Sequence, residues 1–153
     1  RQLAYVQKHL RILSAFYGVL EPMDGVTPYR LEMQANVGIG DAKNLYDYWG
    51  ERLYRSVIDD SRVIINLASK EYSKCIEKYL TPKDTYITIS FCELSGNKLV
   101  TKGTYAKMAR GEMVRFMAER EIENPAEIQK FDRLGYTFRR DLSSESEYVF
   151  ERK

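Results

Sequence analysis

The 153-residue sequence is 44% hydrophobic and 30% charged, which is ordinary for one globular domain. No apolar run approaches the roughly 20 residues needed to cross a bilayer, so we expect no membrane partner. The net charge of +2 is too small to identify a nucleic-acid-binding protein by composition. A basic binding surface would therefore require Lys and Arg side chains to cluster in space.

The sequence opens at Arg1 with charged and polar residues, where a signal peptide would place an apolar run. It has no initial methionine and begins inside a helical pattern. We therefore expect residues 1–153 to form a single domain or the C-terminal portion of a longer protein.

Few residues are suited to metal or nucleophilic chemistry. The two cysteines, Cys75 and Cys92, do not make a secreted disulfide framework, and we expect both to be reduced. His9 is the only histidine, so a histidine metal cluster or a Ser/His/Asp triad would need residues from outside the chain. The sequence also lacks Walker and dinucleotide-binding motifs. We expect no cofactor, no metal and no catalytic residue.

The first half of the sequence predicts mainly helices. Leucine and valine residues at helical spacing predict a helix over 3–16 that ends at Gly18. Proline and glycine predict a loop over 21–30. Residues 41–58 predict a helix interrupted at Gly50, and we expect its aromatic residues to pack inward: Tyr46, Trp49 and Tyr54.

The second half mixes strands and helices. β-Branched residues predict strands over 62–67 and 85–92, and a turn at 95–97 predicts a hairpin completed by 98–102. Helices are expected after Ser69, over 104–121 and after Asn124, where Pro125 stands at the first helical position. Edge strands are expected over 136–140 and 148–152. The irregular alternation predicts an α+β fold in which helices pack on a small mixed sheet.

The helix over 104–121 has two distinct faces. Its core face is predicted at helical spacing and comprises Tyr105, Ala106, Ala109, Met113, Phe116 and Met117. Lys107, Gly111 and Arg115 follow one another every four residues on the opposite side. Arg110 lies between this stripe and the edge of the core. A stripe of this kind can face phosphates or can be an ordinary solvated surface.

Gly111 is the most informative residue of this helix. Glycine inside a helix costs about 1 kcal/mol relative to alanine, so something should offset that cost. One explanation is that a neighbouring segment packs closely against it. The other is that a ligand such as a phosphate approaches the backbone between Lys107 and Arg115. Both remain open at this point.

Two further segments could hold an anion. In an extended segment Arg30 and Glu32 share one side, where they form an internal ion pair or where Glu32 orients Arg30 toward a cleft. Asn66, Ser69 and Lys70 stand at a strand-to-helix junction, and helix N-termini bind anions through free N–H groups. The junction lacks the glycines of a phosphate loop, and capping by Ser69 also explains it.

Taken together, these segments resemble the YaaA family of bacterial peroxide-stress proteins, specifically its C-terminal portion. The matching stretches, in chain order, are HLRILSAFYGVLEPMD, PYRLEM, LYDYWG, INLASKEY and YAKMARGEMVRF, followed by FDRLGYTF…SSESEYVFERK. The resemblance implies a cytoplasmic protein of the peroxide response that helps to keep intracellular iron low. It also implies DNA binding through a positively charged cleft and a helix-hairpin-helix element, and no established enzymatic activity.

On this sequence the hairpin of that element would be Tyr17-Gly18-Val19-Leu20. Leu20 stands where such a hairpin usually has a second glycine, and Pro22 and Pro28 delay any following helix. This departure ranks the helix over 104–121 above the hairpin as the phosphate-binding element. Tyr17 or Tyr29 could also stack on exposed bases.

The leading hypothesis is a protein that binds DNA, duplex or distorted duplex, through its backbone and with little sequence specificity. The candidate DNA-binding residues are Lys107, Arg110, Gly111, Arg115, Arg30, Lys70, Tyr17 and Gly18. We expect Lys107, Arg110 and Arg115 to form one positive surface with Arg30 or Lys70. An enzyme acting on a nucleotide or nucleic-acid phosphate, with Glu32 or Glu71 as general base, is the alternative. An iron-handling protein ranks last.

Overall fold

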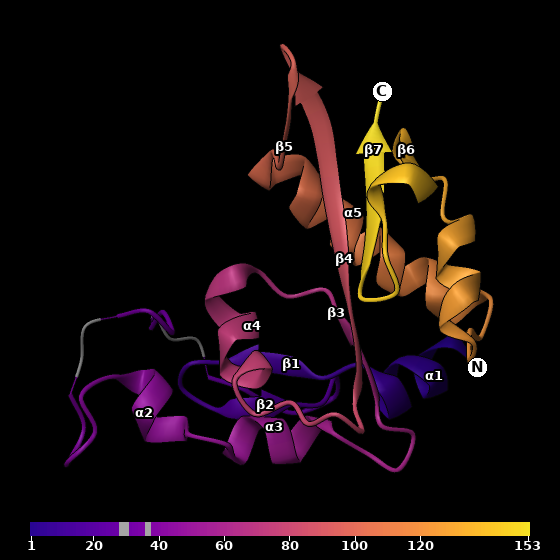
Figure 1. Cartoon of the computed structure of the whole chain (residues 1–153). Helices are drawn as coiled ribbons and strands as arrows, with labels where there is room; N and C mark the ends of the chain where they lie inside the picture. Colours follow the sequence, from indigo (N-terminus) through magenta and orange to yellow (C-terminus); the bar gives the residue numbers. More distant parts are fainter. Residues whose placement is uncertain (28–30, 36–37) are drawn as a thin grey trace. The chain divides into compact units, whose positions relative to one another are not determined.

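The computed structural model describes residues 1–27, 31–35 and 38–153. The chain divides into two compact units, which we treat separately (Figure 1). The sheet unit comprises residues 1–8, 65–67 and 86–153, and the hairpin unit comprises residues 9–64 and 68–85. Within the described ranges, no helix is both long and apolar enough to span a membrane.

A small mixed sheet organises the sheet unit. Its strands are β3 (Val63–Asn66), β4 (Thr85–Ser95), β5 (Lys98–Val100), β6 (Tyr136–Phe138) and β7 (Glu147–Arg152). The order is β3-β4-β7-β6, and β5 folds back on the end of β4. β7 runs parallel to β4 and antiparallel to β6. The fold is therefore α+β, as the sequence predicts.

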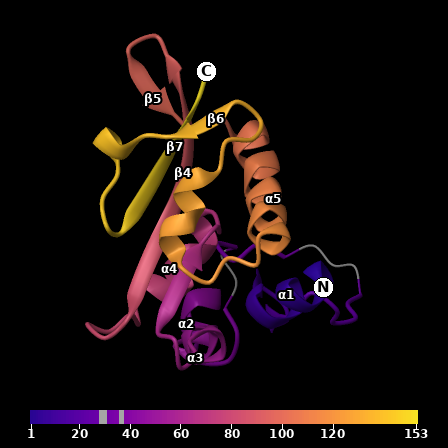
Figure 2. The ribbon, with the colours of Figure 1, turned by 90° about the vertical axis from the view of Figure 1, so that its right-hand side faces the viewer.

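Helix α5 (Gly103–Glu119) packs along one face of this sheet (Figure 2). Ile87, Ile89 and Phe91 alternate on the face of β4 that meets it, as the two-residue period of a strand requires. The core also takes in rings from the rest of the unit: Phe116, Phe131, Tyr136, Tyr148 and Phe150. Several of these rings pack edge to face, as Phe116 and Phe131 do with 5.4 Å between their centroids, and this packing stabilises the core.

Three short helices complete the sheet unit. They are α1 (Gln2–His9) and the 3-10 helices η1 (Pro125–Lys130) and η2 (Arg140–Leu142). The Tyr5 hydroxyl donates a 2.6 Å hydrogen bond to the Ile122 carbonyl and so ties α1 to the end of α5. The Asn124 side chain caps η1 by accepting from the Ala126 N–H, with Pro125 at its first position as expected.

The prediction that residues 148–152 form an edge strand is wrong. β7 lies between β4 and β6, so of the two predicted edge strands β6 alone lies at an edge of the sheet. Val149, Phe150 and Glu151 are buried in succession, because neighbours cover β7 on both sides and both faces. Consecutive buried positions of this kind are typical of a central strand. The strand over 85–92 and the hairpin strand that follows it are confirmed, although β4 continues to Ser95.

The predicted helix over 3–16 is wrong in its second half. Helix α1 ends at His9, and the hairpin unit then forms antiparallel strands β1 (Ile12–Ser14) and β2 (Gly18–Leu20). Ser14 Oγ accepts a 3.0 Å hydrogen bond from the Tyr17 N–H and closes the turn. Turn chemistry therefore overrides the helical spacing of the leucines. The segment Tyr17–Leu20 is part of this β-hairpin, and no helix-hairpin-helix is seen there.

Helices α2 (Leu45–Trp49), α3 (Arg52–Val57) and α4 (Lys70–Glu77) complete the hairpin unit. The break at Gly50 is confirmed: its φ of +52° is in the left-handed region that favours glycine. The first of these helices starts at Leu45, later than predicted, because Asn44 caps it by accepting from the Asp47 N–H. Ser69 is at the N-cap position of α4, but its side chain makes no capping hydrogen bond.

Candidate nucleic-acid interface

The inner face of α5 is largely as predicted. Ala106, Ala109, Met113 and Phe116 are buried against the sheet. Tyr105 is the exception, because 43% of it is exposed. It stands at the N-terminal end of the helix, beyond the cover of the sheet core.

The outer face of α5 carries the predicted stripe. Lys107 and Gly111 are exposed, and no carboxylate of the described part of the chain lies within ion-pair distance of Lys107. Arg115 is 68% exposed, but its Nε donates a 2.9 Å hydrogen bond to Glu119. The free positive charge of the stripe therefore concentrates at Lys107.

A cation that the sequence reasoning did not single out completes the stripe's C-terminal end. Arg133 donates from Nη2 to Glu119 at 2.7 Å and from Nη1 to Glu112 at 3.1 Å. The hydrogen bond from Arg133, joined by that from Arg115, holds the pKa of Glu119 below its usual range. Two arginines and two carboxylates therefore balance at this end, and Arg115 is only partly available to a phosphate.

Arg110 is half-buried at the edge of the core. Its Nε is fully buried and has no hydrogen-bond partner among the described residues. Burial is the main cause that raises the pKa of the Tyr136 hydroxyl. The nearby positive charge of Arg110 acts in the opposite direction and lowers that pKa. Arg110 thus sits below the stripe and contributes positive potential from beneath it.

Gly111 has open space around it. A Cβ built on this residue meets no atom within 4 Å in the described chain outside its own helix. Close packing of a described neighbouring segment, one of the two explanations for this glycine, is therefore wrong. The explanation that remains for a functional glycine is a ligand that approaches between Lys107 and Arg115.

The other two basic candidates are outside the sheet unit as the structure describes it. Lys70 is exposed at the start of α4, in the hairpin unit, and Arg30 falls outside the described residues. A surface shared by α5 with Lys70 or Arg30 therefore stays a prediction. Glu71, proposed as a general base, is engaged in the fold: its carboxylate accepts from the Gln34 N–H and its carbonyl accepts from the Tyr46 hydroxyl.

Tyr17 and Gly18 have local structural partners. The Tyr17 hydroxyl accepts from the Thr27 N–H at 2.8 Å. Gly18 is buried with φ +88°, and a Cβ there would come 2.8 Å from the ring of Trp49. This geometry gives Gly18 a packing role beneath the indole.

Neither cysteine has the features of a peroxide-reactive thiol. Both are buried, and burial raises the pKa of Cys92 and raises that of Cys75 to about 11. Since the thiolate is the reactive form, both side chains are protonated at neutral pH and poorly nucleophilic. Among the described residues, no three His, Cys, Asp or Glu side chains are grouped so that they could hold a metal ion.

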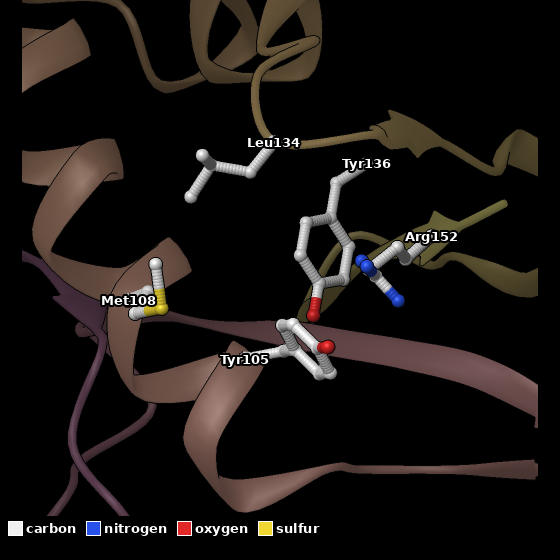
Figure 3. A pocket seen from close by; sticks show the side chains of 5 residues that line it. All are labelled: Tyr105, Met108, Leu134, Tyr136 and Arg152. Carbon is white, nitrogen blue, oxygen red and sulfur yellow. The ribbon is translucent and has the colours of Figure 1, made fainter.

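A small hollow beside the stripe was not predicted from the sequence. Its volume is about 120 Å³, and Tyr105, Met108, Leu134, Tyr136 and Arg152 line it (Figure 3). The guanidinium of Arg152 stacks over the Tyr105 ring, 3.9 Å from its centroid. Tyr105 and Met108 are three residues apart on the helix, so their side chains are neighbours and both line the hollow.

The sequence of the chain now places it among known proteins. Residues 1–142 match the family described as peroxide stress protein YaaA. The chain belongs to the YaaA family. The resemblance seen in its motifs is therefore confirmed.

Its relatives are bacterial UPF0246 proteins. One from Agathobacter rectalis is 84% identical over 152 residues, which is 99% of this chain and 61% of the relative. Those from Lachnoclostridium phytofermentans and Desulfitobacterium hafniense are 56% and 53% identical, over 97% and 95% of this chain and 58% of each relative. The chain thus spans about three-fifths of the length of the relatives that it matches.

Proposed function

We propose that this YaaA-family chain binds DNA in the cytoplasm during peroxide stress, through phosphates and with little sequence specificity. The contact surface is the outer face of α5. Peroxide and free ferrous iron together damage DNA, so a protein that occupies DNA would limit that damage. This also gives the family's peroxide association a physical basis.

The observation that carries the proposal is the pairing of Lys107 with Gly111. Lys107 has no carboxylate partner in the described chain, and Gly111, one turn further on, exposes bare helix backbone. A glycine there costs helix stability and gains no described packing contact, which supports a role in binding. A phosphate at this point would be flanked by Lys107 on one side and Arg115 on the other.

Backbone binding predicts a characteristic salt dependence. Each phosphate neutralised by Lys or Arg releases counterions, so affinity should fall steeply as salt rises. No helix of a recognised base-reading type was identified in the sequence, so affinities for different duplexes should be similar. Affinity that stays flat between low and physiological salt, or a strong preference for one short site, would contradict the proposal.

The test is fluorescence anisotropy of a labelled duplex titrated with purified protein at several salt concentrations. Lys107→Gln should weaken binding and reduce the salt slope by roughly one contact. Lys130→Gln is the matched control, because Lys130 is 63% exposed on η1 but already paired with Glu127 at 2.7 Å. Equal effects of the two substitutions would refute the interface on α5.

The same samples test the enzyme alternative. Protein, labelled DNA and divalent metal are incubated together and the DNA is separated by size. DNA that migrates more slowly in complex with the protein but keeps its full length fits the proposal. New, shorter DNA products would show that the protein hydrolyses DNA, and the enzyme alternative would then hold.

A further inference from the structure

The hollow beside the stripe has the size and lining of a site for one aromatic ring. The hollow is open to solvent and measures about 120 Å³, less than the engineered cavity of about 150 Å³ that encloses a benzene molecule, so it can seat no more than one six-membered ring. Tyr105, Met108 and Leu134 supply apolar walls, and Arg152 supplies hydrogen-bond donors at the rim (Figure 3). Such a mixture is typical of small-molecule sites.

The sheet explains why a charged side chain lines the hollow. Glu93 on β4, Arg152 on β7 and Tyr136 on β6 are partners in one row across the sheet. This row follows the apolar row of Phe91, Phe150 and Phe138, two residues away along each strand and so on the same face. The core therefore ends in a charged row, where Arg152 lies 3.6 Å from Glu93 and beneath Tyr105.

The backbone at the rim of the hollow is strained. Leu134 has φ +57°, in the left-handed region where leucine is uncommon and where asparagine or glycine costs less free energy. Leu134 is 45% exposed, so burial of its apolar side chain does not explain why a leucine occupies this position. Strained residues of this kind cluster at functional sites, and this one presents its side chain to the hollow.

The hollow lies next to the stripe on the surface of α5. At 3.6 residues per turn, Met108 is displaced about 20° from Arg115 around the helix axis, and Tyr105 about 60° further. A DNA strand whose phosphates contact Lys107 and Arg115 would thus hold its bases next to Met108 and Tyr105.

We propose that this hollow receives one unpaired pyrimidine base of a DNA strand bound on the stripe. Tyr105 and Met108 would contact the face of the ring, and Arg152 would donate to a base carbonyl. The inference rests on the proposed DNA binding and adds to it a preference for duplexes that contain an unpaired base.

Three labelled duplexes of one sequence test the inference. The first is fully paired, the second carries a single thymine bulge, and the third carries an abasic residue in the same bulge. Stacking of one base on a protein aromatic predicts about tenfold tighter binding of the thymine bulge than of the abasic bulge. Equal affinity of wild-type protein for the two bulges would overturn the inference.

Three variants show whether the preference arises at the hollow. Tyr105→Ala and Leu134→Asn should each remove it, and Leu134→Asn should leave the melting temperature unchanged or raise it, because asparagine accepts a positive φ. Tyr48→Ala is the matched control: Tyr48 is also a surface tyrosine, 39% exposed, stacked on by Arg52. If Tyr48→Ala loses the preference as fully as Tyr105→Ala, the hollow is not the site.

The fully paired duplex separates the two proposals. Normal binding of that duplex without a thymine preference overturns only the base site. Failure to bind any of the three duplexes overturns DNA binding and the base site together.

Discussion

The two units of the chain are stabilised in different ways. In the sheet unit, apolar and aromatic side chains form one continuous core between α5 and the strands. In the hairpin unit, individual aromatic residues are anchored by a polar atom: the Trp49 indole N–H donates to the Ala15 carbonyl at 2.9 Å, and the Tyr54 hydroxyl donates to Asp84 at 2.5 Å. The sheet unit therefore depends on one continuous packed core, whereas the hairpin unit combines buried side chains such as Met33, Leu45 and Leu53 with specific hydrogen bonds and turns.

The largest expected effect is the loss of volume from the sheet unit. Phe116 is fully buried, so Phe116→Ala should lower the free energy of unfolding by about 3–5 kcal/mol. Urea titration followed by circular dichroism measures this. Phe16→Ala in the hairpin unit is the control, because Phe16 is 57% exposed and its truncation should cost much less. Similar losses from the two substitutions would contradict the account of the core.

The next largest effect is the destabilisation of the hairpin unit by a substitution in its β1–β2 turn. Gly18→Ala places a methyl group 2.8 Å from the Trp49 ring at a φ of +88°, and should cost about 2 kcal/mol or more. Trp49 is the only tryptophan, so its fluorescence reports this unit directly. Gly25→Ala, with no atom within 4 Å of the added carbon, should change the transition little. An unchanged Trp49 transition in Gly18→Ala would show that the packing role assigned to Gly18 is wrong.

A smaller loss of stability is expected when the pH is lowered and the Asp84 carboxylate becomes protonated. The Asp84 carboxylate accepts from Tyr54 and from the Thr81 N–H, and pairs with Arg62 at 2.7 Å. These contacts, the Tyr54 hydrogen bond first, hold the pKa of Asp84 below its ordinary value of 3.8. The stabilisation is therefore complete above about that pH and is lost as the pH falls through the lowered pKa.

Thermal melts followed by Trp49 fluorescence between pH 7 and pH 2 measure this dependence. Asp84→Asn should melt lower than wild type at pH 7, and the gap should close as the pH falls toward 2. Asp60→Asn, at an exposed position of the same unit, should keep the wild-type acid dependence. A constant gap between Asp84→Asn and wild type at every pH would rule out the ionised carboxylate as the source of stability.

How far the sequence predicts the structure also differs between the units. In the sheet unit, hydrophobic periodicity locates α5 and β4, because burial against one core is what that periodicity records. It places β7 wrongly at the edge, since strand order depends on pairing between distant segments. In the hairpin unit, the Ser14 hydrogen bond and the positive φ of Gly18 decide the fold after His9, and neither is visible in the spacing of leucines.

The candidate site was predicted in part. Four-residue spacing correctly places Lys107, Gly111 and Arg115 on one exposed face of α5. The pairing of Arg115 with Glu119 follows from their four-residue spacing on the helix, but the contact of Glu119 with the distant Arg133 could not be foreseen. The hollow was missed for a related reason: its lining comes from α5, β6, β7 and the turn before β6, which only the folded sheet unit brings together.

The most direct test of the interface on α5 is the pair Gly111→Ala and Gly111→Leu. Open space around Gly111 predicts that alanine stabilises the helix by up to about 1 kcal/mol and that leucine leaves the melting temperature near that of wild type. Because leucine fills the space between Lys107 and Arg115, Gly111→Leu should bind duplex DNA more weakly with no loss of stability. If Gly111→Leu binds DNA as tightly as wild type, Gly111 is merely an exposed glycine, and the outer face of α5 is not where this protein meets DNA.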